Sequence, residues 1–304
     1  MGTPTIAMNC LKALLDNKNI EVVGVVTQPD KLVGRKQILT YSSVKQLALQ
    51  HNLKIFQPHK ISEIKQEIEN LKPDLIYTCA FGQFIPESIL SIPKYKCVNL
   101  HASLLPLLRG GAPIHYAIIN QFKQTGFSLM YMIKQMDAGN IIKQFAITIE
   151  PEETYKSLYD KLCLLAYNVT LDNVELLFNE NLQSIKQDEA KATFAYNITR
   201  QQEKIDWNDQ AINIAAKIRG LYDKPIAYTQ YDNEEIKIHE ASYINRQHNN
   251  LSGEIIEISK QGILVAAGRD LILLEVIQLP GKTPLHVSQI INGKHKFVKN
   301  KIFN

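Results

Sequence analysis

The sequence predicts an α/β domain with a mostly parallel sheet, followed by a small domain of short strands. Strand-like apolar runs alternate with helical runs through the first half of the 304 residues, and short strands separated by turns fill the region beyond residue 205. Alternating strands and helices favour a parallel sheet covered on both faces, whereas consecutive short strands favour a small barrel. We therefore expect a Rossmann-like domain over residues 1–180, a linker over 181–204 and an OB-like barrel over 205–304.

The expected elements follow from the spacing of apolar residues along the chain. Short apolar runs predict strands at 21–27, 54–56, 74–79 and 97–101, with a strand-rich region at 126–149. Apolar residues at helical spacing predict helices at 43–51, at 61–71, from 113 onward and at 154–178. Residues 179–206 are polar and without periodicity, which is typical of a linker. After them a helix at 211–222 precedes strands at 227–231, 235–243, 253–258, 262–267 and 271–278.

The composition is that of a globular protein without a membrane-spanning segment, with 45% hydrophobic residues, 21% charged residues and a net charge of +4. This mild positive charge permits an anionic partner without requiring one. The four cysteines, at positions 10, 79, 97 and 163, lie far apart, and we expect reduced core residues rather than a disulfide or zinc framework. These features predict a cytoplasmic protein, and we expect it to act as a monomer away from membranes.

One strand is absent from the expected pattern. Gly2-Thr3-Pro4 resembles the turn that follows the first strand of a doubly wound sheet, and residues 6–15 resemble the helix after that turn. Because that strand is normally central, its loss would leave unpaired backbone groups on both neighbouring strands. We expect the first strand to be missing, either because the true start lies upstream or because the chain is damaged.

The most informative stretch is the predicted strand 97–101 (CVNLH) together with the turn after it. Side chains alternate along a strand, so Asn99 and His101 are expected to share one face near the strand's carboxyl end. Ligands bind at that end of an open α/β sheet. Asp137 follows about thirty residues later, in the segment Met-Asp-Ala-Gly. An amide donor, an imidazole and a carboxylate together predict an acyl-transfer site.

Each of these three residues also has an ordinary structural explanation. A lone asparagine or aspartate is usually a turn former, and a lone histidine is more often a hydrogen-bonded surface or core residue. The combination favours chemistry, because hydrogen-bond donors fixed at a developing oxyanion are a large catalytic contribution. Asn99 and His101 suit that role, whereas Asp137 would stabilise a positive charge on the imidazole or accept a proton from the attacking amine.

Several further segments match one known family. Besides the strand and turn of residues 99–106 (NLHASLLP) and Met136 to Gly139, they are Gly2 to Pro4, 27–30 (TQPD), 56–58 (FQP), 80–86 (AFGQFIP), 109–114 (RGGAPI) and 204–207 (KIDW). On these motifs the chain resembles the methionyl-tRNA formyltransferases, which are folate-dependent formyltransferases. The resemblance implies transfer of a formyl group from 10-formyltetrahydrofolate to the α-amino group of methionine on initiator tRNA, for translation initiation. It implies direct attack by the amine with no metal and no covalent intermediate.

The resemblance also implies where the two substrates bind. The pterin of the folate would lie against Phe81 and Gly82 and against the turn formed by Ser103, Leu104, Leu105 and Pro106. For Phe84, packing in the core is nearly as plausible as a place in this site. A basic loop would enter the acceptor stem of the tRNA through Lys31, Arg35 and Lys36, supported by Lys45. A second basic cluster would contact phosphates through Lys294, Lys296 and Lys299.

Other functions stay open on the sequence alone. A formyltransferase for a small amine, such as a purine-precursor ribonucleotide or an amino sugar, or a formyl-folate hydrolase would share the same three residues, but the basic loop and the C-terminal domain favour tRNA. A non-catalytic RNA-binding remnant is suggested by the missing strand. The chain also departs from the family at Asp223-Lys224-Pro225, where an Asn-Pro-Trp-Pro-like turn is usual. A dinucleotide-dependent dehydrogenase is disfavoured, because no G-x-G-x-x-G motif occurs.

Overall fold

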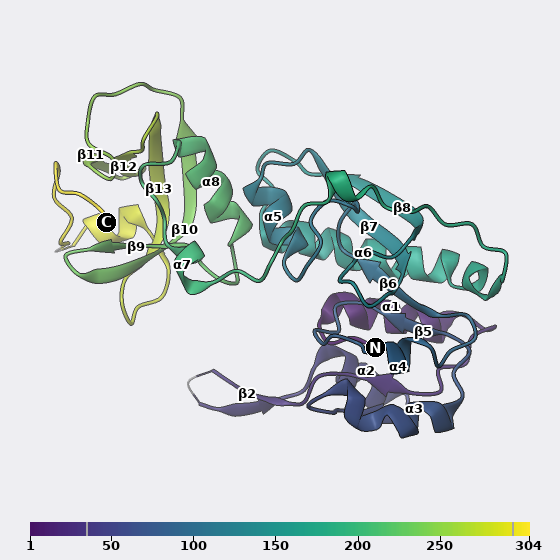
Figure 1. Cartoon of the computed structure of the whole chain (residues 1–304). Helices are drawn as coiled ribbons and strands as arrows, with labels where there is room; N and C mark the ends of the chain where they lie inside the picture. Colours follow the sequence, from purple (N-terminus) through teal and green to yellow (C-terminus); the bar gives the residue numbers. More distant parts are fainter. Residues whose placement is uncertain (35, 294) are drawn as a thin grey trace. The chain divides into compact units, whose positions relative to one another are not determined.

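The computed structural model describes residues 1–34, 36–293 and 295–304. The chain forms two compact units (Figure 1). The first contains residues 1–113, 124–148 and 159–196, and the second contains residues 114–123, 149–158 and 197–304. Within the described residues, no helix is long and apolar enough to cross a membrane, and all four cysteines are free and buried.

The first unit contains a mixed sheet and not the mostly parallel sheet that the sequence suggested. Its four strands lie in the order β5-β6-β7-β8. Only β5 and β6 run parallel, whereas β7 is antiparallel to both of its neighbours. A separate parallel pair joins β1 to β4. The strand bounds are β1 Val25–Val26, β4 Ile55–Phe56, β5 Ile76–Thr78, β6 Cys97–His101, β7 Gln124–Tyr131 and β8 Ile141–Thr148.

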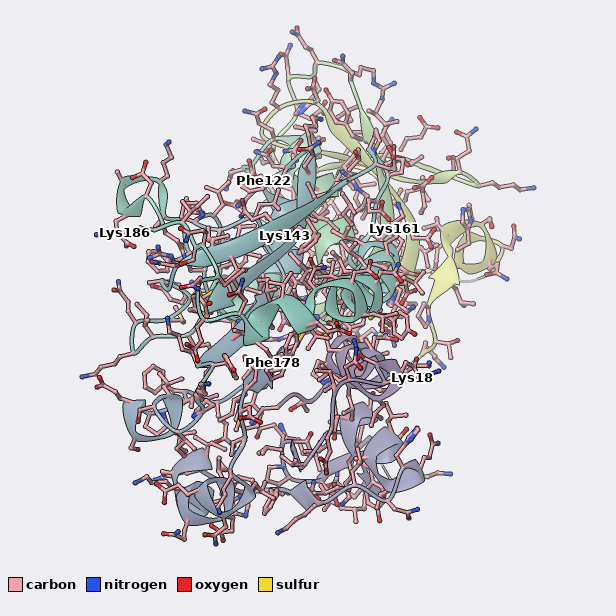
Figure 2. The ribbon with its side chains drawn as sticks, turned by 90° about the vertical axis from the view of Figure 1, so that its right-hand side faces the viewer. Lys18, Phe122, Lys143, Lys161, Phe178 and Lys186 are labelled. Atoms are coloured by element: carbon pink, nitrogen blue, oxygen red, sulfur yellow. The ribbon has the colours of Figure 1, made fainter. Side chains whose placement is uncertain are left out.

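Helices flank these strands close to the predicted positions. In α2, Ser42 serves as the N-cap and accepts a hydrogen bond from the backbone N–H of Lys45. Lys143 of β8 donates to Asn173 near the end of α6, the long helix that lies across the sheet in Figure 2. The helix bounds are α1 Thr5–Asp16, α2 Ser43–Gln50, η1 Ile61–Ile64, α3 Lys65–Leu71, α4 Glu87–Leu90, α5 Pro113–Ile119, α6 Tyr155–Asn173 and η2 Glu175–Phe178.

Among the described residues, no strand pairing joins β1 directly to β5. Gly2 lies between these strands, donating its N–H to Val26 O at 3.0 Å, while the N–H of Cys79 donates to Met1 O at 3.1 Å. The buried α-amino group of Met1 donates to Tyr77 O at 2.6 Å, and this burial lowers its pKa from 8.0 to about 6. A cavity of about 330 Å³ lies beside these residues, and its lining includes β1, β5 and the buried face of α1. We call it the β1–β5 cavity.

The predicted basic loop is a β-hairpin. Strand β2 (Lys31–Val33) pairs with β3 (Ile38–Thr40) in antiparallel register, and all six strand residues are exposed. Figure 1 shows the hairpin projecting from the first unit. The sequence signal was missed because the hairpin has no buried face, so its apolar residues do not alternate with polar ones.

The predicted linker packs against the first unit over much of its length. Ile185 exchanges two 2.8 Å backbone hydrogen bonds with Ile141, and the side chain of Gln187 is buried. A 3₁₀ turn follows at Glu189–Lys191, and Phe194 then forms a parallel bridge with Arg109. The first compact unit accordingly extends to Tyr196.

The second unit is built on an antiparallel sheet of six strands. Five lie in the order β11-β12-β13-β10-β9, and β14 pairs with β13. In its core Trp207 stacks on Phe303, and Tyr231 packs against Phe303 with its ring tilted by 52°. No strand pairing among the described residues closes this sheet into a barrel. The element bounds are α7 Arg200–Glu203, α8 Ala211–Gly220, β9 Tyr228–Tyr231, β10 Glu234–Ile244, β11 Ile255–Ser259, β12 Gly262–Ala266, β13 Leu271–Gln278, β14 Leu285–His286 and α9 Val287–Ile291.

Candidate active site

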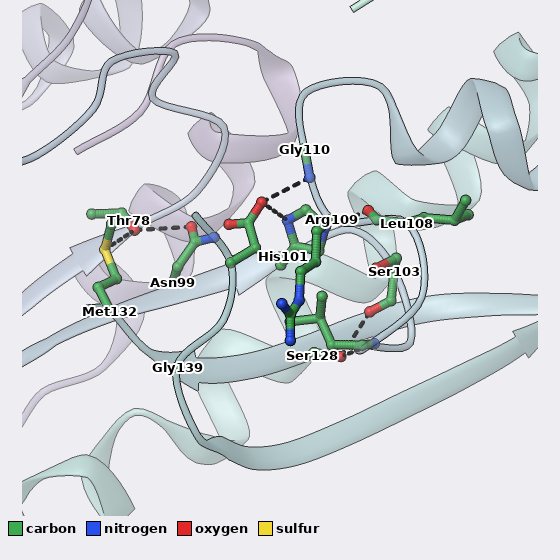
Figure 3. A network of polar contacts seen from close by, with 12 residues as sticks. Thr78, Asn99, His101, Ser103, Leu108, Arg109, Gly110, Ser128, Met132 and Gly139 are labelled. Atoms are coloured by element: carbon green, nitrogen blue, oxygen red, sulfur yellow. Dashed lines mark hydrogen bonds and ion pairs between the residues drawn. The ribbon is translucent and has the colours of Figure 1, made fainter. Parts of the chain in front are cut away.

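Strand β6 carries the two polar residues that the sequence analysis singled out. Its bounds match the prediction, and it is paired on both sides, so its backbone is fixed. Asn99 lies opposite Thr78 on β5, and His101 lies opposite Ser128 on β7. In Figure 3 the side chains of Asn99 and His101 lie on the same side of β6. This arrangement follows from the two-residue period of a strand.

His101 is buried, and both of its ring nitrogens have neighbours. Its Nε2 lies 3.0 Å from the carbonyl oxygen of Leu108, and its Nδ1 lies 3.7 Å from Oδ2 of Asp137. Because a carbonyl can only accept a hydrogen bond, Nε2 carries the proton in this contact. The other ring nitrogen, Nδ1, faces the carboxylate of Asp137.

Asp137 is held in place by its own backbone and by a neighbouring turn. Its Oδ2 accepts a 2.9 Å hydrogen bond from the backbone N–H of Gly110, drawn as a dashed line in Figure 3. The residue adopts a left-handed conformation with φ of 49°, which aspartate tolerates better than most residues. Two residues later, a Cβ at Gly139 would lie 1.8 Å from the carbonyl oxygen of Tyr131. Glycine is therefore required where this loop crosses β7.

A buried polar network holds the loop of residues 137–139 from the other side. The side-chain amide of Gln187 donates to the carbonyl oxygens of Asp137 and Gly139, both at 2.7 Å. Its Oε1 accepts from Nε and Nη2 of the fully buried Arg109 at 3.1 and 2.8 Å. Arg109 also forms a two-point contact with Glu189 at 2.8 and 2.9 Å. This network links the 109–110 turn, the 187–189 segment and the candidate carboxylate.

The amide of Asn99 is oriented by a hydroxyl group on the adjacent strand. Thr78 Oγ1 lies 2.9 Å from Asn99 Oδ1 and 2.9 Å from the carbonyl oxygen of Val98. With Oδ1 directed at Thr78, Nδ2 is directed away from β5. No residue in the described part of the chain is hydrogen-bonded to that nitrogen, so it is available to donate to a ligand oxygen.

The residues predicted to bind folate fall into two groups. Phe81 is buried in a core cluster with Val26 and Ile85, so its ring is not exposed to a ligand, whereas Phe84 is 61% exposed. Gly82 has a positive φ of 81° in the loop after β5. In the second group, Ser103 and Leu105 are buried while Leu104 and Pro106 are half-buried.

The turn of residues 103–106 is anchored to β7 and β8. Ser128 Oγ donates to Ser103 O at 2.7 Å and accepts from the N–H of Leu105 at 2.9 Å. Gln144 donates to Leu105 O at 2.9 Å and to Ser128 Oγ at 2.8 Å. Much of the turn's backbone is therefore already hydrogen-bonded. Folate binding by these residues stays a prediction.

The predicted tRNA-binding residues differ in their exposure to solvent and in whether they form ion pairs. Lys31 and Lys36 are exposed on the β2–β3 hairpin, and Arg35 and Lys294 lie outside the described residues. Lys45 is largely buried and paired with Asp30 at 2.5 Å, with its ammonium 4.0 Å from the Tyr41 ring. These partners disfavour a role for Lys45 in phosphate binding. In the second unit, Lys296 pairs with Glu234, whereas Lys299 is exposed.

Three residues that build the site, Arg109, Gly110 and Gln187, were not predicted from the sequence. Arg109 and Gly110 belong to a segment quoted above only as part of the resemblance. The basic residue between Leu108 and a Gly-Gly pair is the signal that could have indicated them. Gln187 gave no signal, because it lies in a polar stretch interpreted as a linker. Among the described residues, no group of three His, Cys, Asp or Glu side chains is arranged to hold a metal ion.

The fold and this site together define an α/β transferase in which polar side chains converge at the end of β6. Residues 1–174 match the family model described as "Formyl transferase", and residues 197–295 match "Formyl transferase, C-terminal domain". Two solved structures share the fold. They are an N-formyltransferase from Helicobacter canadensis (20% identity, TM-score 0.67, 90% of this chain and 97% of that one) and the sugar 3N-formyl transferase WlaRD (21% identity, TM-score 0.66, 93% and 97%).

Curated relatives are similar over nearly the whole chain. The methionyl-tRNA formyltransferase of Malacoplasma penetrans is 48% identical over 293 residues, covering 96% of this chain and 92% of the relative. That of Ureaplasma urealyticum is 46% identical over 296 residues, covering 97% of each. That of Bacillus cytotoxicus is 44% identical over 297 residues, covering 96% and 94%. The chain therefore belongs to the formyl transferase family and, within it, to the methionyl-tRNA formyltransferases.

Proposed function

We propose that this protein transfers a formyl group from 10-formyltetrahydrofolate to the α-amino group of methionine carried by initiator tRNA. The observation that carries the proposal is the convergence of Asn99, His101 and Asp137 at the carboxyl end of β6. Oδ2 of Asp137 is fixed by Gly110 and lies 3.7 Å from His101 Nδ1. The similarity to methionyl-tRNA formyltransferases over nearly the whole chain supports the choice of substrates.

Transfer requires attack by a neutral amine on the formyl carbon. A bond forms from the methionine nitrogen to this carbon, negative charge develops on the formyl oxygen, and the bond from the carbon to the folate nitrogen then breaks. The methionine nitrogen loses a proton and the folate nitrogen gains one. Fixed donors at the developing oxyanion are each worth about 3–4 kcal/mol of barrier.

Each of the three side chains has one role in this scheme. Asn99 donates from Nδ2, because its Oδ1 is directed at Thr78. His101 donates from Nδ1, because Nε2 is already bonded to Leu108 O. That donation requires a proton on both ring nitrogens. Asp137 accepts the proton of the amine, directly or through a water molecule.

The folate would bind beside this site, between the loops that follow β5 and β6. We assign Phe81 and Gly82 to the first loop and Ser103, Leu104, Leu105 and Pro106 to the second. Because the ring of Phe81 is buried, the first loop would contact the pterin through its backbone. A Gly82→Val variant should weaken folate binding, measured by titration calorimetry with 10-formyltetrahydrofolate, because a β-branched residue is strained at a φ of 81°.

The tRNA would be bound through positive charge on both units. We assign Lys31, Arg35 and Lys36 to the hairpin contact, with Lys45 as its packing support, and Lys294, Lys296 and Lys299 to contacts in the C-terminal domain. A Lys31→Ala/Lys36→Ala variant should lower the slope of log Kd against log salt concentration by about 1–2. Each phosphate contact contributes about 0.9 to this slope for B-DNA, and we use the same value for the RNA duplex. An unchanged slope would remove the hairpin from the interface.

The domain roles follow from these assignments. Residues 1–180 would form the catalytic domain, residues 181–204 would join the domains, and residues 205–304 would form an OB-like tRNA-binding domain. We also propose that the protein acts as a cytoplasmic monomer. Sedimentation of the protein alone and with tRNA tests the monomer, since a dimer would double the mass of both species.

The decisive experiment is formylation of charged initiator tRNA with 10-formyltetrahydrofolate. We expect formyl-methionyl-tRNA as the product. Transfer to an amino sugar nucleotide or a purine-precursor amine, but not to the tRNA, would overturn the proposal. Release of formate without transfer would indicate a hydrolase, and binding of tRNA without any turnover would indicate an RNA-binding remnant.

A further inference from the structure

Two exposed aromatic side chains lie side by side at the end of the segment that packs beside the candidate active site. Phe194 is 48% exposed and Tyr196 is 61% exposed, while Ala195 between them is fully buried. This alternation is the two-residue period of a strand, which directs both rings to the same side. The rings are nearly parallel, with 6° between their planes and 5.6 Å between their centroids. An aromatic pair of this size left in solvent requires an explanation, unlike a single exposed apolar residue.

The backbone beneath the two rings is fixed to the turn that holds the candidate carboxylate. Arg109 N–H donates to Thr193 O at 2.9 Å, Ala195 N–H donates to Arg109 O at 2.7 Å, and Ala112 N–H donates to Ala195 O at 2.9 Å. A Cβ at Gly110 would lie 2.6 Å from Ala195 O, so glycine permits this close approach. The N–H of the same Gly110 donates to Asp137.

The rings are therefore near the reacting groups and restrained in position. The backbone of Phe194 lies one strand spacing, about 4.8 Å, from Arg109, and the next residue along that turn binds Asp137. All of these residues belong to the first unit. The two rings are thus carried on a backbone that is hydrogen-bonded to the turn holding Asp137.

We propose that Phe194 and Tyr196 form a stacking platform for the unpaired nucleotides at the 3′ end of the tRNA, next to the methionyl ester. The inference rests on the proposed function and adds the part of the tRNA that this surface contacts. Single-stranded RNA is bound mainly by stacking of its bases on aromatic side chains. The exposed Lys186 (Figure 2), in the same packed segment, supplies positive charge for the phosphates, whereas Lys191 is paired with Asp188 at 3.3 Å.

The ring geometry restricts how a base can bind. A base inserted between the rings would need two contacts of about 3.5 Å, or about 7 Å between the ring planes. The centroids are only 5.6 Å apart, so the rings are already in contact with each other. A base must therefore stack on the outer face of the pair. The platform would accept any base, because every base has a π face.

The platform is tested directly with uncharged initiator tRNA that carries 2-aminopurine at its last or penultimate position. Binding to the wild-type protein should quench the fluorescence of 2-aminopurine, because the fluorophore stacks on an aromatic ring. The Phe194→Leu/Tyr196→Leu variant keeps apolar bulk but removes both π faces, and it should abolish the quenching. Phe194→Tyr/Tyr196→Phe retains the rings and should restore it. Quenching that persists in the leucine variant would overturn the platform.

Steady-state kinetics provide the second readout. In the leucine variant we expect KM for charged tRNA to rise about tenfold, with kcat and KM for 10-formyltetrahydrofolate unchanged. The control is Ile185→Ala, which removes a side chain that is 73% exposed in the same segment and should leave both parameters unchanged. A rise in KM for the folate alone, or a fall in melting temperature without any effect on tRNA, would assign the rings to the pterin or to packing and overturn the inference.

The two proposals fail in distinguishable ways. If the wild-type protein does not formylate charged tRNA, the proposed function is wrong, whatever the fluorescence shows. If the wild-type protein does formylate the tRNA but the leucine variant matches it in both quenching and KM, only the stacking platform is wrong.

Discussion

Within the first unit, the carboxyl end of β6 is densely hydrogen-bonded, whereas the region between β1 and β5 contains a cavity. At the end of β6, the three candidate catalytic residues are hydrogen-bonded or ion-paired and held by a buried network. Between β1 and β5 lies a cavity of about 330 Å³, and beside it the backbone of Gly2 pairs with Val26 and that of Met1 with Cys79. Asp137 and His101 are held from the side of β7 and the 109–110 turn, away from the cavity.

The largest expected effect comes from removing a reacting group at the end of β6. His101→Ala or Asp137→Asn should lower kcat on the order of a hundred- to a thousandfold, because each removes a donor or the proton acceptor. The measurement is formylation of charged tRNA at saturating folate. Turnover is expressed per folded molecule, because truncation of the buried His101 also leaves Leu108 O without its partner and lowers the melting temperature.

Near-normal turnover in either variant would remove that residue from the mechanism. The matched control is Asn140→Ala, a residue of the same loop whose exposed side chain donates one hydrogen bond, to Ser184 at 3.3 Å, among the described residues. We expect this control to retain wild-type turnover, which separates loss of chemistry from general disturbance of the loop.

Removing the side chain of Gln187, which is hydrogen-bonded to the 137–139 loop, is expected to have the next largest effect. Gln187→Ala deletes two 2.7 Å hydrogen bonds to the loop and leaves the Arg109 guanidinium without one of its partners. Buried hydrogen bonds contribute about 1 kcal/mol each and more when one partner is charged, so we expect a loss of about 2–4 kcal/mol in unfolding free energy. Turnover should also fall about tenfold as Asp137 becomes mobile.

Gln183→Ala is the control for this variant. It removes an exposed glutamine of the same segment whose side chain, within the described part of the chain, donates just to the nearby Asn181 O at 3.2 Å. Denaturant unfolding should give equal free energies for this control and the wild type. If Gln187→Ala also unfolds like the wild type, the network does not support the site.

The difference between the two regions also explains what the sequence could reveal. The bounds of β6 were predicted in full, because an apolar run with two polar residues in strand period is a local signal. Asn99 and His101 were selected from this local signal and Asp137 from the motif around it, and their catalytic roles stay a prediction.

Long-range packing could not be predicted in the same way. Gln187 lies 50 residues from Asp137, and nothing in its polar neighbourhood indicates that its amide is buried. The direction of β7 was missed because an apolar strand has the same pattern whether it is parallel or antiparallel. The β2–β3 hairpin has two exposed faces, so burial imposed no pattern on its residues.

A pH titration tests the other side of the comparison. The pKa of the Met1 amine is lowered by burial to about 6, against 8.0 when exposed. The folded state therefore binds this proton more weakly than the unfolded state. Stability from this group is complete above pH 8 and is lost as the pH falls to about 6, by roughly 2–3 kcal/mol in total. Chemical denaturation at pH 8 and pH 6 measures this loss.

Acetylation of the Met1 amine isolates this effect from other titrating groups. The acetylated protein lacks the ionisable group, so its unfolding free energy should fall less between pH 8 and pH 6. Equal slopes for both forms would show that the amine is not buried beside the β1–β5 cavity. Turnover per folded molecule should not differ between the two forms, because the cavity does not contact the candidate site.

The smallest expected effect concerns Thr78, which belongs to β5 and so borders both regions. Its hydroxyl group lies 2.9 Å from Asn99 Oδ1, and Thr78→Val removes that contact while keeping the side chain's shape. One hydrogen bond of about 1 kcal/mol corresponds to roughly a fivefold loss in kcat, as the Asn99 amide becomes free to rotate. Thr125→Val on β7 is the matched control, because its buried hydroxyl has no hydrogen-bond partner and its removal should cost neither stability nor turnover. If the two valine variants behave alike, the strand geometry of β6 alone orients Asn99, and β5 contributes nothing to the chemistry beyond pairing.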